Sequence, residues 1–367
     1  MLKLLKKQVL GAAKSLGGLN LVSSSGWRRD RLLILGYHGL ALSDEHLWNP
    51  SLFMPPDLFR RRIEFMLDFG CSILPLGEAL ELQAASKLPE KAVAITFDDG
   101  FYNFYKSAAP ILRDYGLPSS VYVTTFYSLY NKPVFGIAVD YLLWKARARS
   151  VTLDIEGCVS GEFDLSNAET RAKLHETIWR HTEIEDYSAK AKNDLLERLC
   201  DGLGIDHEEF CEQRLFNLMT TDEISEVSNM GIGVELHTHR HRMPRDRQLF
   251  DKEIRDNRNV IADCTGIEPE HFCYPSGNYD RVFFSWLKKN GLRSATTCDS
   301  GMVSRSTHRM QIPRLIDTAT LSEIEFEGWI TGAASLLPRR KLVRINVPTV
   351  LNAIPLTQIG ELITYSH

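Results

Sequence analysis

The chain has 367 residues, a length that allows one large domain or two ordinary ones. With 44% hydrophobic and 25% charged residues, its composition is typical of a soluble globular protein. The net charge of -4 is unevenly distributed: residues 1–31 carry a net charge of +6 and the remainder is near -10, which argues against nucleic acid as a partner of the main body.

The chain starts with MLKLLKKQVLGAAKSLGGLNLV, which places leucine and lysine at helical spacing. Three interpretations compete for this basic amphipathic arm, residues 1–30: a helix on a membrane surface, a secretory signal peptide and an arm in solvent. Lys14 and the flanking glycines interrupt the apolar core that a signal peptide needs, so peripheral membrane contact through residues 1–31 is favoured. No run of about 18 apolar residues occurs, so no spanning helix is expected.

The cysteines bear on the compartment. There are seven, without a C-x-x-C pair: Cys71, Cys158, Cys200, Cys211, Cys264, Cys273 and Cys298. An odd, scattered set fits free thiols in a reducing compartment better than a disulfide framework. The sequence therefore favours a cytoplasmic location, with membrane association left open by the N-terminal arm.

Strands and helices alternate in the first part of the chain. Residues 31–40 (RLLILGYHGL) predict a buried strand and a loop bounded by glycine, and residues 55–71 predict an amphipathic helix that starts after prolines. A second strand is expected in residues 91–100 (KAVAITFDDG), a helix in residues 105–116 and a third strand in residues 119–125.

The alternation stops at residue 131, and residues 131–220 show long, mostly charged helical patterns that indicate a helical insertion. It then resumes with a helix (220–231, where Thr220 and Glu223 are spaced for a capping box), a strand (232–239), a helix (247–266), a strand and loop (271–277), a helix (279–291) and two strands (292–298 and 310–316). The main domain is thus placed at residues 31–330, followed by a tail, residues 331–367, without a recognisable motif.

Polar residues follow the ends of the predicted strands. Alternating strands and helices indicate a parallel sheet, open or closed, whose strand C-termini form the working face. His38, Asp98, Asp99, His237 and Tyr274 each come just after a predicted strand. We therefore expect these five residues to gather at one end of the sheet.

Asp98 and Asp99 are adjacent carboxylates at the end of the strand AVAITF. One of them could cap the next helix, but a cap needs only one. Two close carboxylates perturb each other's protonation unless a cation neutralises one. A metal ion would use one as a ligand and leave the other free to act as a base.

His237, His239 and His241 could supply further ligands, because alternate residues of an extended segment point to the same side. A turn at Arg240 could bring only two of them inward, and a solvated basic loop remains the alternative. Two imidazoles, one carboxylate and an open position would make a catalytic zinc site.

The segments TFDDGFYNFYKSAAPILRDYGLPSSVYV, HTHRH and FCYPSGNYD resemble the motifs of the polysaccharide deacetylases, the NodB-homology domains of carbohydrate esterase family four. ILGYHGL and the helix after it resemble members whose chain opens with a Tyr-His motif. The resemblance covers residues 31–320 except the insertion. It implies a distorted (β/α)7-like barrel and metal-dependent hydrolysis of an N-acetyl group on a sugar.

The resemblance also implies roles. Asp99, His237 and His241 would bind the metal, most simply Zn²⁺, although cobalt or nickel would fit the same ligands, and His239 is not a ligand. Asp98 would be the general base. The oxyanion would be held by the metal and by the segment Tyr274, Pro275 and Ser276, through a backbone N–H near Ser276.

Two positions depart from the family pattern. Cys273 stands where the family commonly has an arginine that orients the base, and Arg314 is a substitute, with a surface salt bridge as the alternative. The late motif with the catalytic histidine is missing. His38 is therefore expected to be the acid that protonates the leaving amine, unless it is a buried histidine bonded to a loop carbonyl.

The sequence thus predicts a deacetylase acting on an N-acetylated cell-surface glycan or its lipid-linked precursor. Two alternatives remain open. The same metal site could hydrolyse another non-peptide C–N amide, such as a cyclic ureide. The chain could also be a carbohydrate-binding protein without catalytic activity.

Overall fold

The computed structural model describes residues 2–155 and 157–338, so most of the predicted tail lies outside the described residues. At its centre, parallel strands pair in the order β11-β10-β9-β6-β5-β1-β12, with β4 added beside β5. The strands are β1 (Leu33–Tyr37), β4 (Ser72–Ile73), β5 (Ala92–Phe97), β6 (Ser120–Val123), β9 (Gly233–Leu236), β10 (His271–Cys273), β11 (Ser294–Thr296) and β12 (Leu315–Ile316).

The two end strands of this sheet approach each other. The Ile312 N–H donates to the Ala295 carbonyl, and the Thr297 N–H donates to the Ile312 carbonyl, so the segment leading into β12 is bonded to the β11 region. The expected distorted (β/α)7 barrel is confirmed.

The barrel strands are buried on both faces, as their apolar sequences predict. Every residue of β1 and of β5 is buried, because helices cover the outside and side chains fill the interior. The surrounding helices are α5 (Pro56–Asp68), α6 (Leu76–Ala84), η1 (Phe104–Ala108), α7 (Ala109–Asp114), α13 (Thr221–Asn229), α14 (Arg247–Thr265), α15 (Arg281–Lys289) and α16 (Glu323–Thr331). The capping box predicted at Thr220 and Glu223 is present at the start of α13.

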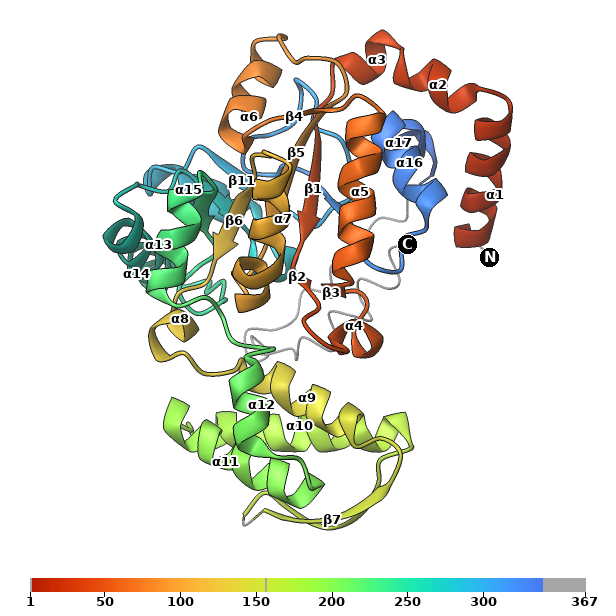
Figure 1. Cartoon of the computed structure of the whole chain (residues 1–367). Coiled ribbons are helices and arrows are strands. Elements are labelled where there is room, and N and C mark those ends of the chain that lie inside the picture. Colours follow the sequence, from red (N-terminus) through yellow and green to blue (C-terminus); the bar gives the residue numbers. More distant parts are fainter. Residues whose placement is uncertain (1, 156, 339–367) are drawn as a thin grey trace.

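The insertion forms a lobe at one end of the barrel (Figure 1), and its hydrophobic core also includes Ala41, Phe53 and Phe101 from the adjoining barrel domain. Its elements are α9 (Phe135–Lys145), β7 (Ser150–Ile155), β8 (Val159–Asp164), α10 (Ala168–Ile184), α11 (Ala189–Leu203) and α12 (His207–Gln213). The antiparallel β7–β8 hairpin differs from the expectation of helices alone. Alternate residues of β7 are buried, which is the period of a strand with one covered face.

The N-terminal segment folds as α1 (Leu2–Ser15), α2 (Gly18–Ser23) and α3 (Gly26–Arg29), beside α16 and α17 (Ala333–Leu336) and away from the insertion (Figure 1). Leu10 and Leu19 are each only 2% exposed. A Cβ on Gly328 of α16 would lie 2.9 Å from Leu10, so glycine permits this close approach. The segment is therefore packed on the barrel domain.

Arg28 fixes this segment most firmly, because it is fully buried. Its Nε donates to the Ile330 carbonyl at 3.0 Å and its Nη1 to the Arg31 carbonyl at 2.8 Å. Burial lowers the pKa of Arg28 to about 10. Arg28, one of the seven basic residues among residues 1–31, is thus structural. Among the described residues, no helix is long and apolar enough to cross a bilayer.

Candidate active site

The main candidate residues follow the C-terminal ends of three barrel strands. His38 follows β1, Asp98 and Asp99 follow β5, and His237 follows β9. These strands are parallel, and backbone pairing keeps their ends level: the Asp98 N–H donates to the Tyr37 carbonyl at 2.8 Å. The structure thus brings the predicted residues to the same end of the barrel.

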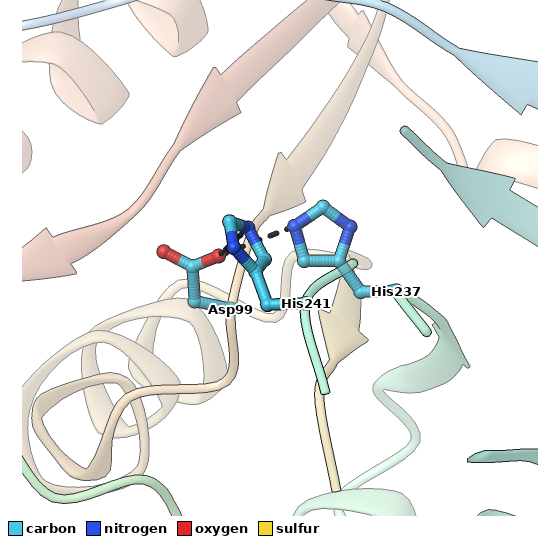
Figure 2. A group of neighbouring side chains, drawn as sticks. All are labelled: Asp99, His237 and His241. Carbon is cyan, nitrogen blue, oxygen red and sulfur yellow. Dashed lines mark ion pairs between the residues drawn. The ribbon is translucent and has the colours of Figure 1, made fainter. Parts of the chain in front are cut away.

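Asp99, His237 and His241 form a compact cluster, with their side chains facing one another (Figure 2). Asp99 Oδ1 lies 3.2 Å from His237 Nε2 and 3.3 Å from His241 Nε2. Two ligand atoms at about 2.0–2.1 Å from a tetrahedral zinc ion are separated by roughly 3.3 Å. The donor types and their spacing therefore fit a divalent metal, and the structure brings together the three ligand residues predicted from sequence.

Hydrogen bonds to its other atoms orient His237. Its Nδ1 donates to the Cys273 carbonyl at 2.8 Å, so Nε2 is the nitrogen left to bind a cation. Its backbone N–H donates to Asn257 Oδ1 at 2.9 Å, and the Asn257 amide donates to the Val123 carbonyl at 2.9 Å. His241 is the more open ligand, with its side chain 24% exposed.

The backbone is strained at the ligands. Asp99, Thr238 and His241 have φ values of 69°, 63° and 56°, in the left-handed region that side chains rarely adopt. Each such residue costs on the order of 1–3 kcal/mol and persists where the surrounding fold imposes it. Thr238 supports its loop through Oγ1, which accepts from the Arg242 N–H at 3.0 Å.

Asp98 is held by Arg314. The guanidinium donates from Nη1 to Oδ1 and from Nη2 to Oδ2, each at 2.7 Å, and both side chains are almost completely buried. Arg314 also donates to Thr96 Oγ1 (3.0 Å), to the Thr297 carbonyl (3.1 Å) and to Cys273 Sγ (3.0 Å). All five N–H donors of the guanidinium thus have an acceptor. The alternative of a surface salt bridge does not hold.

Two small residues leave space for Arg314. A Cβ on Gly36 would lie 2.7 Å from Ile316 Cδ1 and 3.3 Å from the Arg314 guanidinium. Cys273 is short enough for Arg314 to reach Asp98 beside it. The departure from the family pattern at position 273 and the arginine at 314 are therefore parts of one arrangement.

The charges around the two aspartates keep both ionised. Burial alone would raise the pKa of Asp98, but Arg314, with His38 and His237, holds it below its usual value. Burial would also raise the pKa of Asp99, yet hydrogen bonds with His237 and His241 hold it well below its usual value. Burial would lower the pKa of His237, but Cys273 and Asp99 raise it well above its usual value. A cation bound by Asp99, His237 and His241 would replace the proton that the Asp99 carboxylate shares with the imidazoles.

His38 is half-buried at the end of β1, and its charge helps to lower the pKa of both aspartates. It follows β1 as the two aspartates follow β5, so it lies at the same end of the barrel. Tyr274 is different: its ring is fully buried, its hydroxyl donates to the Met310 carbonyl at 2.9 Å and its N–H to the Thr296 carbonyl at 3.1 Å. Pro275 has no N–H, so Ser276, with a φ of 56°, remains the oxyanion candidate of this segment.

Two further polar residues, His239 and Asn257, lie near the site, and only Asn257 was not identified from sequence. His239 lies outside the ligand cluster, and its Nδ1 is 2.8 Å from Thr125 Oγ1. Asn257, fully buried on α14, links the backbone of His237 to the next strand. The buried face of α14 also carries Glu253 beside its apolar residues, so the sequence pattern of this helix does not single out Asn257.

The fold and the residue cluster define the chain as an α/β barrel with a candidate metal site at the C-terminal ends of its strands. The sequence model of the family described as "Polysaccharide deacetylase" matches residues 85–141 and 179–295. The unmatched residues between these segments fall in the insertion. The chain belongs to the polysaccharide deacetylase family.

Curated relatives match in part. YxkH of Bacillus subtilis, which is named for this family, is 33% identical over 94 residues, 25% of this chain and 32% of that protein. The poly-beta-1,6-N-acetyl-D-glucosamine N-deacetylase of Escherichia coli K12 is 26% identical over 101 residues, 27% of this chain and 15% of that protein. The chain thus aligns with about a third or less of these relatives.

Solved structures share the fold over more of the chain. The Streptococcus pyogenes deacetylase PplD, in complex with acetate, has a TM-score of 0.53 at 18% identity and covers 84% of this chain and 99% of that one. IcaB from Ammonifex degensii has a TM-score of 0.52 at 17% identity and covers 82% and 97%. At these identities the likeness shows the fold alone.

Proposed function

We propose that this protein is a metal-dependent hydrolase that removes an N-acetyl group from an amino sugar of a cell-surface polysaccharide or its precursor. The observation that carries the proposal is the Asp99–His237–His241 cluster next to an Asp98 that Arg314 holds by both oxygens. The family supports the reaction class, and the name of the Escherichia coli relative supports an N-acetylglucosamine polymer as substrate.

A divalent cation held by Asp99, His237 and His241, with zinc as the default, would supply Lewis acidity toward the acetyl carbonyl and a water of lowered pKa. Asp98 takes the proton of the attacking water, with Arg314 fixing the plane of its carboxylate. The backbone N–H of Ser276 donates to the developing oxyanion. His38 donates a proton to the departing amine nitrogen.

Two other functions share these residues. Hydrolysis of another non-peptide C–N amide would use the same base and ligands on a different carbonyl. A carbohydrate-binding protein without activity would have no use for a base fixed through a buried arginine, so the Asp98–Arg314 pair favours catalysis.

The test is acetate release from acetylated amino sugars and their oligomers, measured before chelation, after chelation and after zinc is restored. Release that stops with chelator and returns with zinc supports the proposal. Release of ammonia or of a ring-opened product from amides without a sugar would identify the second function. Saccharide binding without turnover in the zinc-loaded protein would identify the third.

We propose peripheral membrane contact through the outer face of α1 and α2. Leu4, Leu5, Leu16 and Leu21 are 63%, 55%, 84% and 75% exposed on a segment without an acidic residue before Asp30. Exposed leucines among lysines suit an anionic lipid surface, where a lipid-linked sugar would also be found. Sedimentation with anionic vesicles should be reduced by Leu16→Glu but not by Leu249→Glu, whose leucine on α14 is 56% exposed.

We further propose a cytoplasmic location. All seven cysteines are free thiols in the described part of the chain, as expected in a reducing compartment. Fractionation of cells should recover the protein with the cytoplasm or with the inner face of the membrane. Recovery outside the membrane would contradict this.

A further inference from the structure

A pocket of about 260 Å³ lies between the barrel and the insertion, outside the metal cluster. One wall comes from α8 (Phe126–Tyr130) and the loop after β9, and the other comes from α10 and α11 of the insertion. We infer that this pocket is a subsite for a neighbouring sugar of the glycan chain, which makes the enzyme prefer oligomers to single sugars. The inference rests on the proposed deacetylase function and names where the rest of its substrate lies.

The pocket is lined with aromatic rings from both walls. Phe126, Tyr127 and Tyr130 belong to α8, and Tyr187 belongs to the insertion. Phe126 packs against Tyr130 with ring centroids 5.0 Å apart, and Tyr130 is still 52% exposed. Such rings offer flat apolar faces with a polar edge, which suit the C–H faces of a sugar ring and its hydroxyl groups.

The same loop builds the pocket and the metal cluster. Arg240 and Arg242 line the pocket and bracket the ligand His241 in the chain. The Phe126 N–H donates to the His239 carbonyl at 2.8 Å, and the Arg240 guanidinium lies 5.4 Å from the centre of the Phe126 ring. The loop that carries His241 thus also contributes to the pocket wall, which puts the pocket next to this loop.

Charged side chains at the pocket complete a polar lining. Lys192 lies 2.9 Å from Glu183, and Arg242 lies 3.9 Å from the same carboxylate. These paired side chains offer hydrogen-bond donors and acceptors to the hydroxyl groups of an uncharged sugar. The volume is slightly below the roughly 300 Å³ at which pockets for drug-sized ligands begin, which suits a monosaccharide unit better than a long segment.

The insertion supplies one wall of this pocket through α10, α11 and the turn between them. The lining residues of this wall fall in residues 182–196, within the second segment that matches the family. The lobe thus adds a second wall to a barrel whose own contribution is α8 and the β9 loop. Removal of contacts at the pocket should change the preference for chain length.

The test compares zinc-loaded Tyr130→Ala with the native protein on N-acetylglucosamine and on its β-1,6-linked tetramer. The ratio of kcat/KM for tetramer to that for monomer is expected to fall about 3- to 10-fold, the loss of one aromatic contact. Tyr130→Phe keeps the ring and should keep the ratio. Leu129→Ala is the matched control, because Leu129 is 53% exposed on the same helix and does not line the pocket.

An unchanged ratio in Tyr130→Ala, or an equal fall in Leu129→Ala, would overturn the subsite while leaving deacetylation intact. If the native protein releases no acetate, calorimetric binding of the tetramer to Asp98→Asn decides the matter. Binding that Tyr130→Ala weakens would support the subsite and reject the proposed function. No binding would reject both.

Discussion

Arg314→Lys tests whether the base depends on the exact set of bonds made by a guanidinium. Arg314 donates to five acceptors: both oxygens of Asp98, Thr96 Oγ1, the Thr297 carbonyl and Cys273 Sγ. Lysine keeps the charge but has three donors and a shorter reach. At least two of these five buried bonds must therefore be lost.

A lost bond to a buried polar group costs about 1–3 kcal/mol, so the loss of two should lower the free energy of unfolding by roughly 2–6 kcal/mol. The loss of turnover should be larger than this loss of stability alone would cause. A positioned base contributes roughly 10²- to 10⁴-fold, and a carboxylate free to rotate loses much of that. We expect kcat to fall about 100-fold while the metal content is unchanged, because none of the three ligands contacts Arg314 in the structure described.

The assay combines acetate release, metal content by mass spectrometry and urea unfolding. Arg309→Lys is the matched control: it lies on the same segment, is half-buried and donates to the Leu80 carbonyl at 2.8 Å, away from the cluster. Full turnover in Arg314→Lys, or loss of metal in parallel with turnover, would refute the positioning of Asp98 by Arg314.

Three further predictions concern other residues. Asp99→Ala should lose bound metal, whereas Asp98→Asn should keep the metal and lose turnover; equal metal loss measured in both would reject the division of roles. His38→Gln should keep the metal and lower kcat by roughly 10²-fold or more, with the smallest loss on substrates whose leaving group needs no proton. Burial lowers the pKa of His271 to about 4 from 6.5, so its neutral form stabilises the fold above pH 6.5, and this is lost as the pH falls toward 4. Between pH 7 and pH 4.5 the free energy of unfolding should fall less in His271→Gln than in the native protein, by about 2.5 kcal/mol at pH 4.5, and parallel curves for the two proteins would contradict the assignment.

The barrel and its ligand set could be predicted because both follow from local order along the chain. Apolar runs bounded by helices predict buried parallel strands, and parallel strands place whatever follows them at one edge. That rule located His38, Asp98, Asp99 and His237. It says nothing about where the loops turn, so the choice of His241 over His239 rested on the resemblance to a family.

Other features depend on contacts between distant parts of the chain. Arg314 lies 216 residues from Asp98, and its place in the barrel follows from the space left by Gly36 and Cys273. Arg28 contributes to the positive charge of residues 1–31, but three backbone carbonyls accept its N–H groups in the interior. The composition of a segment does not reveal such partners, because they come from elements far away in sequence.

The pair of adjacent carboxylates shows how one strand end can supply two functions. Successive residues of a regular strand point to opposite faces, so two neighbours would not ordinarily serve one site. At Asp99 the backbone turns to a φ of 69°, and Gly100 follows with a φ of 79°, where a Cβ would lie 2.9 Å from Val123. This turn lets Asp98 stay bonded to Arg314 in the barrel interior while Asp99 faces the two imidazoles. The strain at Asp99 is therefore the structural reason that a base and a metal ligand can be consecutive residues.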